Sequence, residues 1–300
     1  MMRGKQAWAV AMRDPEGKIV THVEPLGSIY RSRIARIPFL RGMILLWDAL
    51  GLGMRALTLS ANVQGDEDEQ LEGASLYLTM AVSLFLGIAL FFLLPALIGG
   101  WVEHLLAPAT SAGSGVRPLL FPSDLTVSGA HIWLGNILEG FIRLLLLVGY
   151  IWAIGFLPDI RRLFAYHGAE HKTINAYEAG AELTPESVAR FPLAHARCGT
   201  AFLLTLVVLS ILAFALLGSL PLFWRLLSRV LLIPLLAGIA VEYIRWTANH
   251  LDSPLVRLLV RPNLALQSLT TREPDASMLE VAITAFQTMR AAEEEFSPRS

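Results

Sequence analysis

Residues 76–101 read LYLTMAVSLFLGIALFFLLPALIGGW, a stretch without a single charge in which most side chains are apolar. A helix needs about 20 mainly apolar residues to cross the roughly 30 Å hydrocarbon core of a bilayer, because each residue advances about 1.5 Å. The stretch meets this requirement. We therefore expect an integral membrane protein organised around this segment.

The composition of the whole chain supports a membrane protein. Of its 300 residues, 54% are hydrophobic and only 16% are charged, whereas soluble domains carry about 25% charged residues. The formal net charge of -1 gives no basic surplus for a nucleic-acid backbone, so nucleic-acid binding is disfavoured. The single cysteine, Cys198, excludes an intramolecular disulfide and a four-cysteine zinc site.

Three further segments have the length and composition of spans: Ile132–Leu157, Gly199–Leu220 and Leu222–Ala248. The first of these contains Glu139 and Arg143, which are four residues apart and so share one helix face, where they can form an ion pair. Pro221 separates the last two segments as a tight hairpin. The sequence thus predicts an all-α membrane protein with about four transmembrane helices within residues 76–248.

The distribution of Lys and Arg predicts the orientation. Nine of them precede the first span, whereas the loop at 102–130 holds only Arg117. Because cytoplasmic loops are enriched in Lys and Arg, we expect both termini and the loop at 159–198 to be cytoplasmic, in a multi-pass protein of the inner or plasma membrane. Residues 1–30 lack the apolar run of a cleavable signal peptide.

The remaining segments predict small cytoplasmic elements. Residues 1–37 contain AWAVAMR and KIVTHVE around the turn DPEG, which is typical of a β-hairpin. Residues 38–75 comprise an amphipathic helix at 38–60, lying on or beneath the membrane or re-entering it, and an acidic linker at 65–73. Residues 249–300 form a helical segment whose last helix is capped near Asp275.

The loop at 159–198 carries the residues that suggest chemistry. His167, Glu170 and His171 follow the order H-x-x-E-H used by inverted zinc peptidases. On a helix the two histidines lie about 40° apart, close enough to hold one metal ion, and Glu170 could act as general base or ligand. His195 and Cys198 could complete the set, giving a site for a divalent metal ion with zinc as first candidate.

Several alternatives stay open at this stage. His195 and Cys198 could instead cap and pack the start of the next helix. His22, His104 and His131 are isolated in the sequence, and we expect them at surfaces or interfaces. Further candidates for a third ligand are Glu178, Glu242, His250 and Asp252.

Three motifs together resemble a known family: HGAEHKTINAYE at 167–178, HARCGTAF at 195–202 and PNLALQSLTTREPDASMLEVAI at 262–283. They are similar to those of the bacterial integral-membrane family catalogued as domain of unknown function 1385. The resemblance covers nearly the whole chain and includes MMRG at the start, although members usually carry a glycine-rich stretch before it. Members are commonly labelled predicted metal-dependent enzymes, which implies a metal site without naming a reaction.

Two functions fit these observations. One is a metal-dependent hydrolase at the cytoplasmic membrane face, with the metal held by His167 and His171 and Glu170 as base. The other is a non-catalytic membrane scaffold or accessory protein, in which the same residues form a structural metal site or hydrogen-bonded cluster and the cytoplasmic elements dock insertion or envelope machinery. A transporter is a third hypothesis, motivated by Glu139, Arg143 and Glu242 in or near spans.

Overall fold

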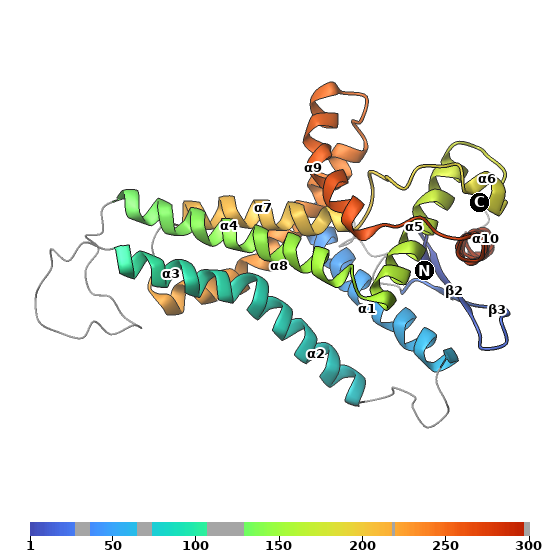
Figure 1. The fold of residues 1–300 in the computed structure, drawn as a ribbon, viewed down its shortest axis with the longest axis horizontal. Helices are drawn as coiled ribbons and strands as arrows, with labels where there is room; N and C mark the ends of the chain where they lie inside the picture. Colours follow the sequence, from blue (N-terminus) through green and yellow to red (C-terminus); the bar gives the residue numbers. More distant parts are fainter. Residues whose placement is uncertain (28–36, 65–73, 107–128, 218–219, 297–300) are drawn as a thin grey trace, which may run out of the picture.

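The computed structural model describes residues 1–27, 37–64, 74–106, 129–217 and 220–296. In Figure 1, α3, α4, α7 and α8 lie side by side in an elongated bundle, while the small sheet, α5, α6 and α10 gather at one end as a cap. The strands are β1 (Met2–Arg3), β2 (Ala7–Arg13) and β3 (Ile19–Pro25), and the helices are α1 (Leu40–Gln64), α2 (Ala74–Ile88), the π-helical turn η4 (Ala89–Leu93), α3 (Leu94–Leu106), α4 (Gly129–Ile154), α5 (Pro158–Glu178), α6 (Pro185–Val188), α7 (Thr200–Leu216), α8 (Leu222–Ala248), α9 (Pro254–Thr270) and α10 (Ala276–Phe296).

Three helical stretches of the described residues are long and apolar enough to cross a membrane: Ala81–Val102, Ile137–Ile154 and Leu222–Ala248. This corrects the expected four spans. The third predicted span forms α7, which has 17 residues and so extends about 26 Å, short of the bilayer core. Arg117 and the acidic linker at 65–73 lie outside the described residues, as do the side chains of His104 and His131.

The first span is continuous through α2, η4 and α3 but changes its winding at η4. The Leu94 N–H bonds to the Ala89 carbonyl, five residues back, as in a π-helix. Pro95 follows and has no N–H to donate, so the Phe91 carbonyl lacks its helical partner. Arg143 of α4 supplies one instead, because its Nε lies 2.9 Å from the Phe91 oxygen.

The bundle encloses a cluster of charges, which we call the buried triad: Glu139, Arg143 and Arg229. Arg143 Nη2 lies 2.7 Å from Glu139 Oε1, which confirms the predicted ion pair. Arg229 of α8 also binds this carboxylate, with Nη2 2.7 Å from Oε2. The three side chains are at most 2% exposed, so they fill the interior, which argues against a transport pathway along them.

The cap is built around the N-terminal sheet. The predicted hairpin is confirmed, with β2 antiparallel to β3, and β1 adds a third strand on the other side of β2. The two faces of β2 are covered by different helices, since Ala9 packs with Leu279 and Phe286 of α10 and Trp8 packs with Leu52 of α1. The first and last segments of the chain therefore share one core.

The predicted helix at 38–60 is α1, and it joins the cap to the bundle. Its C-terminal half packs beneath the sheet, and its start crosses α8 at Gly42, whose absent Cβ would lie 2.7 Å from the Gly238 Cα. Arg41 pairs with Glu242 beside this crossing. A side chain at either glycine would hold the two helices apart.

Candidate metal centre

Helix α5 presents the two histidines of the H-x-x-E-H motif. It starts at Pro158, whose fixed φ suits a first helical position, directly after α4 ends. It ends at Glu178, and two residues later Gly180 has a φ of 70°, which suits glycine and stops the helix from continuing. His167 and His171 are one turn apart on this helix, and their ring centroids lie 4.3 Å from each other.

Main-chain carbonyls fix the orientation of both rings. His167 Nδ1 lies 2.9 Å from the Thr270 oxygen, and His171 Nδ1 lies 2.6 Å from the Leu193 oxygen. A carbonyl can only accept, so each Nδ1 carries a proton and donates it. Metal-binding histidines are held in the same way, with the second ring nitrogen left for the ion.

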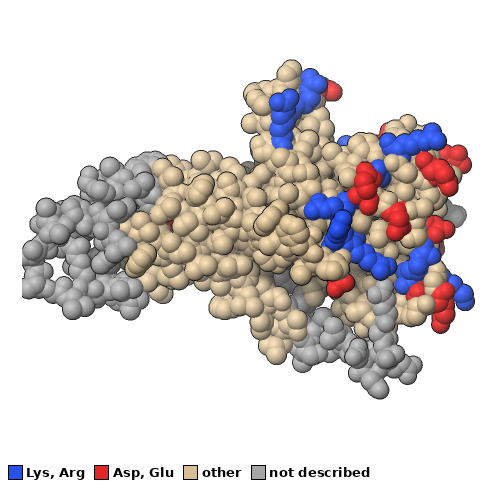
Figure 2. Space-filling model, in the orientation of Figure 1, with Lys and Arg blue, Asp and Glu red and all other residues tan. Residues whose placement is uncertain are grey.

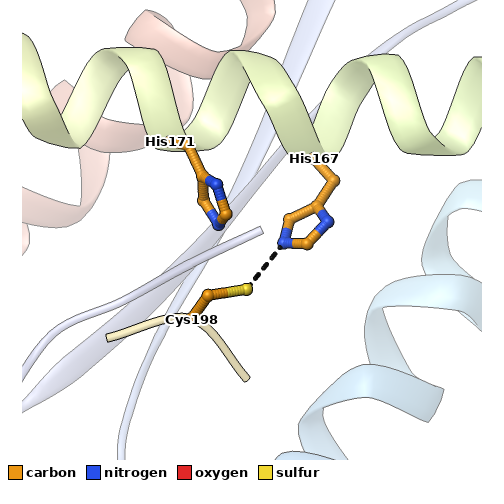
Figure 3. Close-up of side chains that lie close together, drawn as sticks. All are labelled: His167, His171 and Cys198. Atoms are coloured by element: carbon orange, nitrogen blue, oxygen red, sulfur yellow. Dashed lines mark hydrogen bonds between the residues drawn. The ribbon is translucent and has the colours of Figure 1, made fainter. Parts of the chain in front are cut away.

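Cys198 completes the cluster from the segment just before α7 (Figure 3). Its Sγ lies 3.2 Å from His167 Nε2 and 3.1 Å from Thr200 Oγ1. Ligand atoms of His167, His171 and Cys198 all lie within 4.8 Å of one another. We call these three residues the His–His–Cys cluster.

The cluster stabilises a thiolate. Burial by itself would raise the pKa of Cys198, but hydrogen bonds with His167 and His171 and the charge of His167 lower it to about 5. The pKa of His167 moves the other way: burial lowers it, yet the bonds with Cys198 and Thr270 raise it above its ordinary value. Without metal, the opposite directions of these two pKa shifts favour an imidazolium that donates to a thiolate.

The donor set could hold a divalent metal ion. Bond lengths of about 2.0–2.3 Å to nitrogen and sulfur place tetrahedral ligands about 3.5 Å apart. His167 Nε2 and Cys198 Sγ, 3.2 Å apart, are near this spacing, and all three ligand atoms lie within 4.8 Å of one another. Imidazole nitrogens and thiolates bind zinc more strongly than they bind harder cations such as magnesium. The three residues would leave a fourth position for water or substrate.

Gly168 is a structural requirement of this site that the sequence reasoning missed. Its absent Cβ would lie 2.2 Å from the Arg272 oxygen, so only glycine lets the segment after α9 approach α5 this closely. This segment follows directly on Thr270, the last residue of α9, whose carbonyl orients His167. The only sequence signal was a glycine between the motif histidines.

His195 lies beside the cluster but outside it. Its ring centroid is 5.7 Å from that of His171, and its Nε2 lies 3.8 Å from Glu178 Oε2. The buried side chain of Gln267, also missed, bonds both the N–H and the carbonyl of His195 at 2.9 and 3.0 Å. Burial lowers the pKa of His195, which favours the neutral, ligand-competent ring.

Glu170 and the other candidate ligands have different partners. The Glu170 carboxylate lies 2.6 Å from the amino group of Met1 and is 30% exposed. Glu178 binds Arg197 at 2.8 Å, and Glu242 binds Arg41. His250 Nδ1 lies 2.7 Å from the Trp246 oxygen, and Asp252 is exposed. Within the described part of the chain, none of them joins the cluster.

Comparison with known proteins places the chain in a family. The family described as "Protein of unknown function (DUF1385)" matches residues 37–292. The "Uncharacterized protein YqhQ" of Bacillus subtilis (strain 168) is 35% identical over 297 residues, which cover 95% of this chain and 87% of the relative. No solved structure matches the chain. The extent of both matches shows that the chain belongs to the DUF1385 family.

Proposed function

We propose that the protein is a multi-pass membrane metalloprotein that binds a divalent metal ion, zinc first, through the His–His–Cys cluster. One observation carries the proposal: both histidines donate Nδ1–H to main-chain carbonyls, which leaves both Nε2 atoms for an ion beside a thiolate. If the cluster were only a hydrogen-bonded core, the two histidines would not both need to donate from Nδ1 and keep Nε2 on the side of the thiolate.

The charged end of the molecule supports a cytoplasmic site. In Figure 2 the Lys, Arg, Asp and Glu side chains gather over the cap and the projecting helix α9, while the visible face of the bundle is almost uncharged. The cap contains the His–His–Cys cluster and carries basic residues on its surface. By the positive-inside rule, the cap would therefore lie in the cytoplasm. Both termini would share that side, in the inner or plasma membrane.

A hydrolase is the function that three protein ligands favour. When bound, zinc in such a site acts as a Lewis acid and lowers the pKa of its water to about 7. His167, His171 and Cys198 would hold and orient the ion, and the Thr270 and Leu193 carbonyls would keep both rings in place. Glu170 would accept a proton only after leaving the Met1 amino group, and the substrate would enter from the cytoplasm.

A structural site in a membrane scaffold is the second candidate, and the position of His195 favours it. This ring lies next to His171 on a segment outside regular helix, and a rotation would offer a fourth nitrogen. Four protein ligands would close the site to water and exclude hydrolysis. The cap would then serve to dock a protein partner.

Metal content of the full chain purified in detergent tests the proposal. We expect about one equivalent of zinc in the wild type and in the control His250→Ala, which removes an exposed histidine outside the cluster. His167→Ala, His171→Ala and Cys198→Ala should each lose it while staying folded and monodisperse in size-exclusion chromatography, with a lower melting temperature because the stabilising ion is gone. A folded wild type that stays metal-free after reconstitution with zinc, iron and manganese would refute the proposal.

Cobalt substitution distinguishes the two candidates. A thiolate–cobalt charge-transfer band that disappears in Cys198→Ala would identify the ligand. Azide should change the d–d spectrum if a fourth position is open, which supports the hydrolase. An unchanged spectrum that becomes azide-sensitive in His195→Ala would establish the closed structural site instead.

A further inference from the structure

A second site lies where α5 begins, away from the cluster. It is a cavity of about 600 Å³ between the end of α4, the first turns of α5 and the segment leading into α10. Arg161, Arg162 and Arg272 line it together with Glu273, and Phe156 and Met278 form its apolar wall. The volume suits a ligand of headgroup size.

The cavity has a surplus of positive charge. Its one lining carboxylate, Glu273, already lies 3.0 Å from Lys172 Nζ. Arg272 Nη1 donates to uncharged main-chain carbonyls, at 2.8 Å for Thr271 and 3.0 Å for Ser268. Asp275 faces Arg162, but its Oδ1 also accepts from Ser277 and from the Met278 N–H. The carboxylates near the cavity therefore neutralise only part of the charge of its three guanidinium groups.

The start of α5 adds to this field. No side chain caps its first turn, so the free N–H groups and the helix dipole favour an anion there. Asp159 in the first turn offsets part of this effect. Arg161 and Arg162 are both exposed, and the guanidinium carbon of Arg162 lies 6.0 Å from the centroid of the Tyr166 ring.

The position of the cavity identifies the kind of anion. The α4 span ends at Ile154, and Phe156 follows at once with 67% of its surface exposed. Trp152 packs against Phe156 edge to face, with ring centroids 4.8 Å apart. Exposed aromatic side chains at the end of a span are typical of the headgroup region. Figure 2 shows Lys and Arg side chains gathered at this border between the uncharged bundle and the cap.

We propose that this cavity binds the phosphate of an anionic phospholipid headgroup, whose acyl chains lie along Trp152 and Phe156. The arginines provide the fork geometry that phosphate oxygens accept, and the aromatic pair provides an apolar path for the chains. Basic pockets at the cytoplasmic ends of membrane helices bind anionic headgroups in this way. The site is separate from the metal ligands, and it rests on the proposed function only for the insertion in the membrane and the cytoplasmic position of the cap.

Lipid competition on the full chain tests the assignment. The protein is placed in phosphatidylcholine nanodiscs containing increasing phosphatidylglycerol, and bound lipid is counted by native mass spectrometry. Arg161→Gln/Arg162→Gln removes two charges from the cavity. Lys18→Gln/Arg190→Gln removes two exposed charges elsewhere on the cap and serves as the matched control. Inorganic phosphate replaces the lipid in a separate arm.

We expect the wild type and the control to retain phosphatidylglycerol over phosphatidylcholine, and the Arg161/Arg162 variant to bind it about 30-fold more weakly. Equal losses in both variants would show unspecific attraction and overturn the proposal, as would a wild type without preference. Saturation by inorganic phosphate alone, without lipid preference, would assign the cavity to a soluble anion. If the double variant does not fold, Arg161→Gln is the test, with a smaller expected loss.

Discussion

Replacing Glu139 with Gln tests how the buried triad holds the bundle together. The Glu139 carboxylate accepts three hydrogen bonds, from Arg143 Nη2 at 2.7 Å and from Arg229 Nε and Nη2 at 3.0 and 2.7 Å. The substitution keeps the shape of the side chain but removes its charge. Two guanidinium groups, 0% and 1% exposed, would then have no anion beside them.

The expected cost is large. Removing one partner of a buried ion pair costs about 3–5 kcal/mol, because the remaining charge stays desolvated. Here two cations lose the same partner, so we expect the upper end of this range. Contacts with the Phe214 ring, 4.1 Å from the Arg229 guanidinium carbon, compensate only in part. By comparison, Ser210→Ala removes a single bond from Arg143 at 3.0 Å and should cost about 1.5–3 kcal/mol.

Thermal unfolding in detergent, followed by size-exclusion chromatography of the remaining folded protein, measures the effect. At about 2–4 °C per kcal/mol, we expect the midpoint of Glu139→Gln to fall by roughly 10–20 °C. The apolar triple variant Glu139→Leu/Arg143→Met/Arg229→Met should recover most of this loss, since well-packed apolar groups can replace a buried ion cluster. A Glu139→Gln midpoint within about 2 °C of wild type would refute the electrostatic reasoning.

Three further predictions concern the site and the helix crossing. Gly168→Ala should weaken zinc binding about 10- to 100-fold, because its Cβ would displace the chain segment next to Thr270, whose carbonyl orients His167. Competition with a chelator measures the zinc affinity, and equal affinities of variant and wild type would contradict the prediction. The pKa of about 5 predicts that metal-free Cys198, the single thiol of the chain, is alkylated at a nearly constant rate from about pH 6 to about pH 9 and more slowly as the pH falls through about 5. In His167→Ala the midpoint should rise toward the ordinary thiol value of about 8.5, and an unchanged profile would exclude the thiolate–imidazolium pair. Gly238→Ala should lower the free energy of unfolding by about 1–3 kcal/mol, because its Cβ would lie 2.8 Å from the Phe39 oxygen. The control Gly149→Ala has open space around its Cβ and should leave this free energy unchanged. Equal thermal unfolding midpoints for the two variants would contradict the close crossing of α1 and α8.

Much of the fold was readable because its signals are local. The DPEG turn between two strand-like runs predicted the hairpin, and the uncharged stretch at 76–101 predicted the helix through α2 and α3. The extent of α7 was overestimated, because apolar composition alone does not show where a helix ends before Pro221. The third strand was missed because β1 has only two residues, too few for a periodic pattern.

The candidate site could be predicted from the sequence only where metal-binding side chains occur at a recognisable spacing. Helical spacing brought His167 and His171 together, and the second motif supplied Cys198. The carbonyls of Thr270 and Leu193 could not be predicted, because every residue has a carbonyl and the chain segments that carry them are distant in sequence. Arg229 binds Glu139 inside the bundle although the two are 90 residues apart, so sequence spacing could not indicate this contact.

The connectivity explains why these missed residues matter. The cluster unites α5, which continues directly from α4, with the segment that leads into α7, and the Thr270 carbonyl comes from the end of α9. Three elements that enter or flank the bundle therefore meet at one thiolate. In the same way, the buried triad joins α4 to α8 and to the interrupted helix at Phe91. A bound metal would lock the cap-side ends of helices whose middles the triad already fixes. The site can therefore hold its geometry, although a loop supplies its third ligand and the Leu193 carbonyl.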